Sequence, residues 1–111
     1  IVSDLHMGEP YVGLKRSGIL VPRTNALGAD IVVILGDLTA GHRFVTKPIE
    51  VERTAKELAA LKAPLGIFAV LSNHDWWDDP SAQKRRKGPL LGQRSLEQNN
   101  IPVLENQAIK L

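Results

Sequence analysis

The stretch Ile31-Val32-Val33-Ile34-Leu35-Gly36-Asp37-Leu38 decides the fold of this 111-residue chain. Its first five residues are aliphatic and mostly β-branched, which is typical of a strand buried on both faces inside a sheet covered by helices. Gly36 lets the backbone turn at the end of that strand. Asp37 therefore lies at the carboxyl end of the strand, where the chemistry of open α/β sheets collects.

Two other apolar runs also end on polar residues. Ile1-Val2 leads into Ser3-Asp4-Leu5-His6, and the run from 67 to 71 leads into Ser72-Asn73-His74-Asp75. Crossovers between parallel strands are right-handed almost without exception, so the first two strands should be parallel neighbours with their carboxyl ends together. We therefore expect the three polar segments to meet at one edge of a sheet, with Asp4, His6 and Asp37 close together.

The segments between these strands predict helices, and hence an α/β fold with parallel strands and βαβ crossovers. Pro22 disfavours helical geometry at the residue before it, so the first helix is expected from Pro22 to Gly28, with 11–18 left as a loop or frayed helix. Thr46 is the candidate N-cap of a second helix. In that helix apolar residues recur at helical spacing, namely Val51, Ala55, Leu58, Ala59 and Leu61.

The C-terminal third has a weaker pattern. Residues 76–87 are rich in charge and predict an exposed loop, whereas 88–99 predict a short helix with Leu90, Leu91 and Leu96 turned inward. Residues 102–104 and 108–109 predict two short strands around a turn.

Composition excludes several classes of protein. The chain has 14 basic and 12 acidic residues, a formal charge of +2, so its charge predicts no specific nucleic-acid binding. It has no cysteine, which excludes disulfides and thiolate metal sites. It also lacks the Gly-x-x-x-x-Gly-Lys-Ser/Thr loop and the G-x-G-x-x-G motif, so neither a P-loop NTPase nor a Rossmann cofactor site is predicted.

The polar strand ends offer oxygen and nitrogen ligands without sulfur, a set that suits Mn, Fe, Zn or Mg. Asp4 and His6 can reach one ion if the strand persists through Leu5, because alternate residues of a strand point the same way. Asp37 has two carboxylate oxygens and can bridge two ions, and Asn73 can serve the second. Two ions about 3.5–4 Å apart can hold a hydroxide between them and stabilise both oxygens of a phosphoryl displacement, which favours phosphoester hydrolysis.

The order Asp4-x-His6, Gly36-Asp37, Asn73-His74-Asp75 resembles the calcineurin-like metallophosphoesterases, whose usual motifs are D-x-H, G-D and G-N-H-[DE]. The resemblance implies a binuclear hydrolase with an αββα sandwich, of which these residues would form the N-terminal half. It implies that Asp4, His6 and Asp37 bind the first metal, that Asp37 bridges, and that Asn73 binds the second. It further implies that His74 contacts the phosphate and protonates the leaving oxygen, with Asp75 orienting its imidazole.

The chain departs from the family pattern in two respects. Ser72 replaces the usual glycine, a change that fits if the backbone there has negative φ. The family's later histidines, including a G-H-x-H motif, have no counterpart, and His42 is expected to be a solvated loop residue. We therefore expect residues 1–111 to be a partial catalytic domain that folds poorly or associates and does not hydrolyse phosphoesters alone. A truncated, non-catalytic module that binds metal or only contributes structure is the alternative.

Two features bear on partners beyond a phosphoester substrate. The pair Trp76-Trp77 resembles a bacterial branch of the family that includes membrane-associated phosphodiesterases, so membrane association through other segments is an expectation. The run Lys84-Arg85-Arg86-Lys87 could steer an anionic substrate, but a solvated loop is the favoured interpretation.

Overall fold

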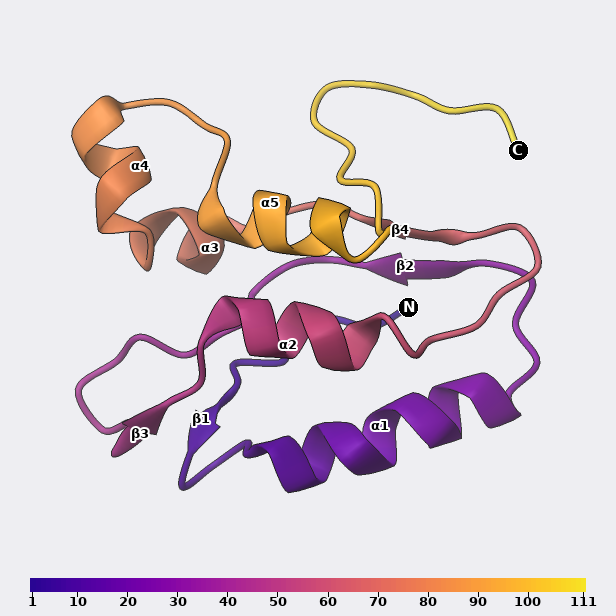
Figure 1. Ribbon diagram of the computed structural model, residues 1–111, viewed down its shortest axis with the longest axis horizontal. Helices are drawn as coiled ribbons and strands as arrows, with labels where there is room; N and C mark the ends of the chain where they lie inside the picture. The colour runs from indigo at the N-terminus through magenta and orange to yellow at the C-terminus, as the bar shows by residue number, and fades with distance from the viewer.

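A computed structural model describes all residues from 1 to 111 and shows a mixed α/β architecture (Figure 1). The helices are α1 (Leu14–Ala26), α2 (Val51–Leu58), α3 (Asn73–Trp77), α4 (Pro80–Arg85) and α5 (Leu91–Gln98). The strands are β1 (Gly8–Glu9), β2 (Val32–Ile34), β3 (Lys47–Pro48) and β4 (Ile67–Ala69). No helix combines the length and the apolar composition needed to cross a membrane.

The centre of the fold is a parallel sheet built around β2. Strand β2 pairs in parallel with β4, and Ile34 lies opposite Ala69. Parallel bridges extend the pairing on both sides, from Val2 to Ile34 and from Ala69 to Val103. The predicted parallel pairing of the first two strands and the βαβ unit formed by β2, α2 and β4 are therefore confirmed.

Helices α1, α2 and α5 lie side by side over one face of this sheet, with α2 in contact with both of the others (Figure 1). Val32 and Ile34 point into the space between the two layers, because alternate residues of a strand face opposite sides. The core there consists of buried side chains from both layers: Val2, Val21, Val32, Ile34, Leu38, Ala55, Leu58, Leu61, Ala69, Leu96, Ile101 and Val103. The molecule is a slab measuring 37 × 32 × 18 Å.

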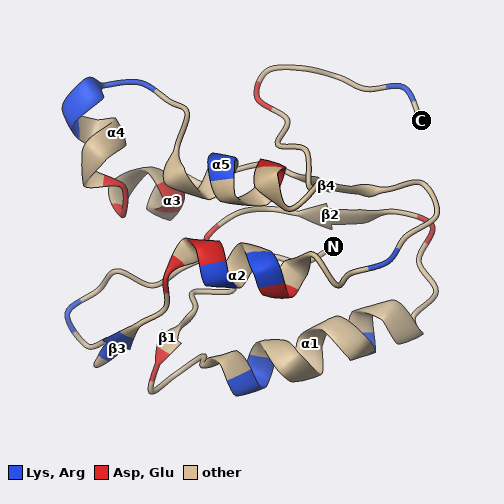
Figure 2. Cartoon of the chain, in the orientation of Figure 1, with Lys and Arg blue, Asp and Glu red and all other residues tan.

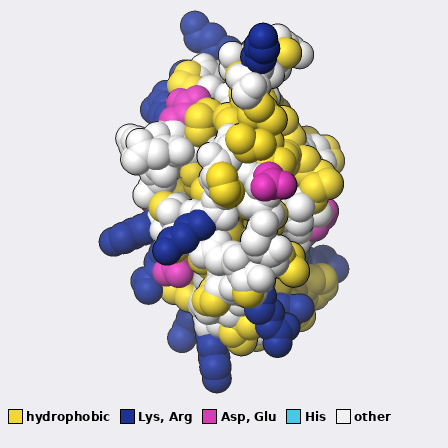
Figure 3. Space-filling model, turned by 90° about the vertical axis from the view of Figure 1, so that its right-hand side faces the viewer, with side chains coloured by type: hydrophobic (Ala, Val, Ile, Leu, Met, Phe, Trp, Pro, Cys, Tyr) yellow, Lys and Arg dark blue, Asp and Glu magenta, His cyan; other side chains and the backbone are white.

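The other face of the sheet is also apolar. Val33, Phe68 and Val70 line a hollow of about 150 Å³ there, together with Ile109 and Leu111 from the C-terminal segment. Figure 3 views the molecule from the side on which β2 and β4 begin, where hydrophobic side chains gather in the upper half and no histidine is visible. His6 and His42 lie in loops that follow the ends of strands, and His74 lies in α3.

Helix α1 starts eight residues before Pro22, so the predicted helix start was wrong. Pro22 lies inside the helix, where its ring removes the hydrogen bond to the carbonyl of Gly18. Gly18 is exposed, with open space around it, so water can reach that carbonyl. Ser17 and Val21 are buried one turn apart, and packing of this face outweighs the local preference of the proline.

Helix α2 begins at Val51 with Glu50 as its N-cap, so the prediction for Thr46 was also wrong. Residues 47 and 48 form β3, which pairs antiparallel with β1. The backbone N–H of Thr46 donates to the carbonyl of Glu9 at 2.8 Å. A long-range pairing thus takes up the segment that the sequence pattern assigned to the first helical turn.

The segment 76–87 is largely helical rather than a loop, because Asp79 caps the helices that follow it. Its buried carboxylate accepts the backbone N–H of Ala82 at 2.8 Å and that of Leu91, at the start of α5, at 2.7 Å. Burial raises the pKa of Asp79, but these hydrogen bonds and the charge of Arg85 outweigh it and hold the pKa below its ordinary value. The Asp79-Pro80 pair is an N-cap followed by the first helical position, a signal that could have predicted α4.

The C-terminal predictions have mixed outcomes. Helix α5 lies within the predicted range, with Leu90 and Leu96 buried, but Leu91 is 42% exposed. Residues 108–109 form no strand. The basic run 84–87 lies at the far end of α4, where it is exposed (Figure 2).

Candidate metal centre

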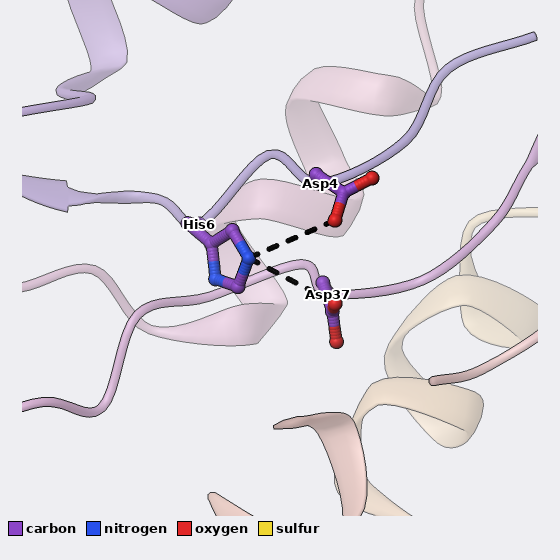
Figure 4. A group of neighbouring side chains, drawn as sticks. All are labelled: Asp4, His6 and Asp37. Carbon is purple, nitrogen blue, oxygen red and sulfur yellow. Dashed lines mark ion pairs between the residues drawn. The ribbon is translucent and has the colours of Figure 1, made fainter. Parts of the chain in front are cut away.

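Asp4, His6 and Asp37 converge at the carboxyl edge of the sheet, with one ligand atom of each within 4.8 Å of the others (Figure 4). Nε2 of His6 lies 3.9 Å from Oδ1 of Asp4 and 3.8 Å from Oδ2 of Asp37. Two donors on one ion, with bonds of about 2.1 Å, lie roughly 3–3.5 Å apart. The donor set and its spacing therefore fit a divalent ion after a small closure.

The backbone brings these side chains together by a route that the sequence pattern did not predict. The strand does not persist through Leu5, because Asp4 (φ 54°) and His6 (φ 41°) are left-handed, as is Asp37 (φ 53°). Each such residue costs about 1–3 kcal/mol, and backbone of this kind clusters at functional sites. Leu5, between the two ligands, packs against the core instead.

Backbone hydrogen bonds join the loop that carries Asp4 and His6 to the loop that carries Asp37. The backbone N–H of His6 donates to the carbonyl of Asp37 at 2.8 Å, and that of Met7 donates to the carbonyl of Leu38 at 3.1 Å. Met7 is 1% exposed and Leu38 is fully buried. The buried neighbours anchor both loops and leave the ligand atoms facing one another.

The loop after β4 adds His74 to this cluster. The backbone N–H of His74 donates to Oδ1 of Asp37 at 3.2 Å, and its ring lies edge-on to the ring of His6 with centroids 5.1 Å apart. Asn73 opens α3, and its Oδ1 accepts the hydroxyl of Ser72 at 3.0 Å. Ser72 has φ −112°, so the condition under which serine can replace the family's glycine is met.

Asp75 does not orient the imidazole of His74 in this structure. Its carboxylate is buried, and both oxygens accept backbone N–H groups, those of Asp37, Leu38 and Ser72. The Ser-x-x-Asp spacing of Ser72 and Asp75 is that of a capping box, a signal that could have predicted this backbone role.

The carboxylate nearest the imidazole of His74 belongs to Asp78, which the sequence analysis did not select. Oδ2 of Asp78 lies 4.0 Å from Nδ1 of His74, and its side chain is 24% exposed. The two residues are four apart on a helix, a spacing that places side chains on one face and could have identified Asp78.

The sequence pointed to three further aromatic residues, and their environments differ. The ring of Trp77, 58% exposed, is 5.2 Å from that of His74. Trp76 instead lines a cavity of about 320 Å³, together with Leu90 and Gln93. His42 is exposed, its Nδ1 accepts the backbone N–H of Phe44 at 3.3 Å, and it is not part of the group of ligands.

Comparison with known proteins is consistent with this geometry. A family model described as calcineurin-like phosphoesterase matches residues 1–109. A Caenorhabditis elegans protein named as a metallophosphoesterase is 40% identical over 76 residues, 68% of this chain and 14% of that protein. A Danio rerio transmembrane protein with a metallophosphoesterase domain is 34% identical over 77 residues, 69% of this chain and 16% of that protein.

A bacterial relative extends the comparison. UDP-2,3-diacylglucosamine pyrophosphatase LpxG of Chlamydia trachomatis is 36% identical over 77 residues, 68% of this chain and 21% of that protein. No solved structure matches. The chain thus spans between 14% and 21% of the length of these curated relatives. On the match over residues 1–109, the chain belongs to the calcineurin-like phosphoesterase family, whose members use divalent metals.

Proposed function

We propose that the protein containing this chain is a metal-dependent hydrolase of phosphodiesters or phosphomonoesters. The convergence of Asp4, His6 and Asp37 supports the proposal most strongly, because two carboxylates and an imidazole within 4.8 Å form a donor set for a divalent ion. Membership of the family supports the reaction class. The name of the Chlamydia relative, a pyrophosphatase, supports a phosphate-containing substrate.

In this proposal Asp4, His6 and Asp37 hold the first ion, and Asp37 and Asn73 hold the second. Oxygen and nitrogen donors of this kind suit Mn, Fe, Zn or Mg. Such ions lower the pKa of water and stabilise charge on the attacking and leaving oxygens of a phosphoryl displacement. One carboxylate and one amide are few donors for the second ion, so we propose that residues 1–111 are part of a catalytic domain whose other segments complete the site.

His74 is the proposed proton donor to the leaving oxygen. Its backbone N–H is held by Asp37, and its Nδ1 faces Asp78 at 4.0 Å, which leaves Nε2 available to the substrate. Proton donation of this kind typically contributes about 10²- to 10⁴-fold to a rate.

The test is to strip the whole protein of metal with a chelator and measure hydrolysis of bis(p-nitrophenyl) phosphate and p-nitrophenyl phosphate before and after adding Mn²⁺. We expect turnover to disappear with the metal and to return with it. Metal binding without turnover on either ester would favour the non-catalytic alternative, and turnover that survives complete removal of metal would contradict the proposal.

A further inference from the structure

The strongest unassigned feature is the environment of Asp75, a buried carboxylate that joins two loops distant in sequence. Its Oδ2 accepts the backbone N–H of Asp37 and that of Ser72, each at 2.9 Å, and its Oδ1 accepts that of Leu38 at 3.0 Å. Its residue exposure is 8%. Asp37 and Leu38 follow β2, whereas Ser72 follows β4, so one side chain fastens both strand ends.

The loop that Asp75 binds needs such a partner. Gly36 (φ 81°) and Asp37 (φ 53°) are consecutive left-handed residues, and this conformation aims the N–H groups of Asp37 and Leu38 at one carboxylate. Successive N–H groups in such turns form a concave site for an anion. Asp75 supplies that anion from within the protein.

The junction between the loop of Asp37 and the start of α3 leaves no room for a side chain at Gly36. A Cβ at Gly36 would lie 2.5 Å from the backbone nitrogen of Ser72 and 2.6 Å from Oδ2 of Asp75. On the far side of the junction, Oδ1 of Asp37 accepts the N–H of His74. The loop of Asp37, the carboxylate of Asp75 and the start of α3 therefore form a closed ring of contacts.

We propose that Asp75 is a positioning residue that holds the backbone of Asp37 in its left-handed conformation and thereby aims the Asp37 carboxylate at the metal centre. The inference rests on the proposed function for its consequence, since Asp37 is the carboxylate shared by the two ions. Asp75 touches neither substrate nor metal in this arrangement. It acts through the backbone and not through the imidazole of His74.

The chain offers a matched control for Asp75→Asn. Asp79 is buried to a similar degree, at 6% exposure, and its carboxylate accepts two backbone N–H groups where that of Asp75 accepts three, but those of Asp79 belong to α4 and α5. Both Asp75→Asn and Asp79→Asn replace a carboxylate that accepts hydrogen bonds by an amide, so both should lower thermal stability.

The Mn²⁺ affinity of the whole protein, measured by calorimetry, should fall about 10- to 100-fold in Asp75→Asn, as is typical for partners of metal ligands. It should change less than about twofold in Asp79→Asn. Unchanged affinity in Asp75→Asn, or an equal loss in both variants, would overturn the proposal.

A second measurement separates this inference from the proposed function. Amide hydrogen exchange of the metal-free whole protein should speed up at residues 37, 38 and 72 in Asp75→Asn and stay as in the wild type in Asp79→Asn. Unchanged exchange at these amides would overturn the role of Asp75. If the wild type binds no metal but the two variants differ in exchange as expected, the proposed function is refuted and the role of Asp75 in positioning the loop is supported.

If Asp75→Asn does not fold, Gly36→Ala disturbs the same junction from the other side. Its control is Gly28→Ala, because Gly28 is also left-handed (φ 61°) but has open space around it, so this change measures backbone strain alone. Loss of Mn²⁺ affinity in Gly36→Ala and not in Gly28→Ala supports the proposal, and retention in both overturns it.

Discussion

The backbone N–H of His74 donates a hydrogen bond to Oδ1 of Asp37 at 3.2 Å, across 37 positions of sequence. The same carboxylate lies 3.8 Å from Nε2 of His6 through its other oxygen, Oδ2. Asp37 therefore connects the N-terminal loop to the first turn of α3. A change at this residue affects the candidate metal centre and the placement of His74 together.

Asp37→Asn should abolish metal-dependent hydrolysis and cause little loss of folding. The amide keeps the shape and an oxygen acceptor for the N–H of His74, but it removes the charge that we propose the two ions share. We expect kcat/KM on bis(p-nitrophenyl) phosphate with Mn²⁺ to fall by more than about 100-fold, beyond the range typical for partners of ligands. Thermal denaturation provides the folding control, and turnover near that of the wild type would contradict the assignment of Asp37.

His74→Asn should lower turnover and leave the bound metal in place, because His74 is proposed to act on the leaving oxygen. We expect a loss of roughly 10²- to 10⁴-fold with a poor leaving group such as an alkyl alcohol. The loss should be much smaller with p-nitrophenol, which needs little help from an acid. Metal content is the control; loss of half the metal would show that His74 is a ligand instead.

Thr54→Val should stabilise the protein. Thr54 lies on α2 with 1% exposure, and its hydroxyl has no hydrogen-bond partner. A buried, unsatisfied hydroxyl costs about 1–3 kcal/mol, and valine has nearly the same shape without it. The free energy of unfolding in denaturant should rise by about 1–2 kcal/mol. Thr54→Ser, which keeps the hydroxyl and removes the methyl group, should lower it, and a loss of stability in Thr54→Val would show that the hydroxyl has a partner.

Asp79→Asn should change how stability depends on pH. The folded pKa of Asp79 lies below its ordinary value of 3.8, so its stabilising contribution is fully present above that value and disappears as pH falls through the lower folded pKa. The free energy of unfolding of the wild type should exceed that of Asp79→Asn by about 1–2 kcal/mol near neutral pH, because asparagine lacks the charge and keeps only one of the two oxygens that accept the N–H groups of Ala82 and Leu91. The difference should shrink once pH drops below about 3.8.

Denaturant titrations at several pH values measure this difference. Asp30→Asn is a suitable control, because Asp30 is an exposed carboxyl with no hydrogen bond to its side chain. If the difference in free energy of unfolding between the wild type and Asp79→Asn stays constant from neutral pH down to about pH 2, the charge of Asp79 does not contribute to stability.

The strand pattern and the candidate ligands were predictable from the chain alone. The β-branched, aliphatic run before Gly36 favoured a buried strand. The carboxyl ends of parallel strands lie at one edge of a sheet, so the meeting of Asp4, His6 and Asp37 followed from topology. Their left-handed backbone did not follow, since no local preference selects φ > 0 at Asp or His over extended geometry. The pairing of the two loops imposes it.

Roles that depend on which groups meet across the fold were decided only by tertiary structure. Local preference placed a helix start at Pro22 and a cap at Thr46, but burial of Val21 and the pairing of β3 with β1 overrode both. The sequence by itself determined the order and chemistry of the motifs, because these depend on residue type and spacing. The contact of Asp78 with His74 lies within one helical turn, so residue spacing alone could have indicated it. The contact of Asp75 with the backbone of Asp37 was decided by the folded arrangement of strands β2 and β4, because it joins residues 38 positions apart that only a packed core brings together.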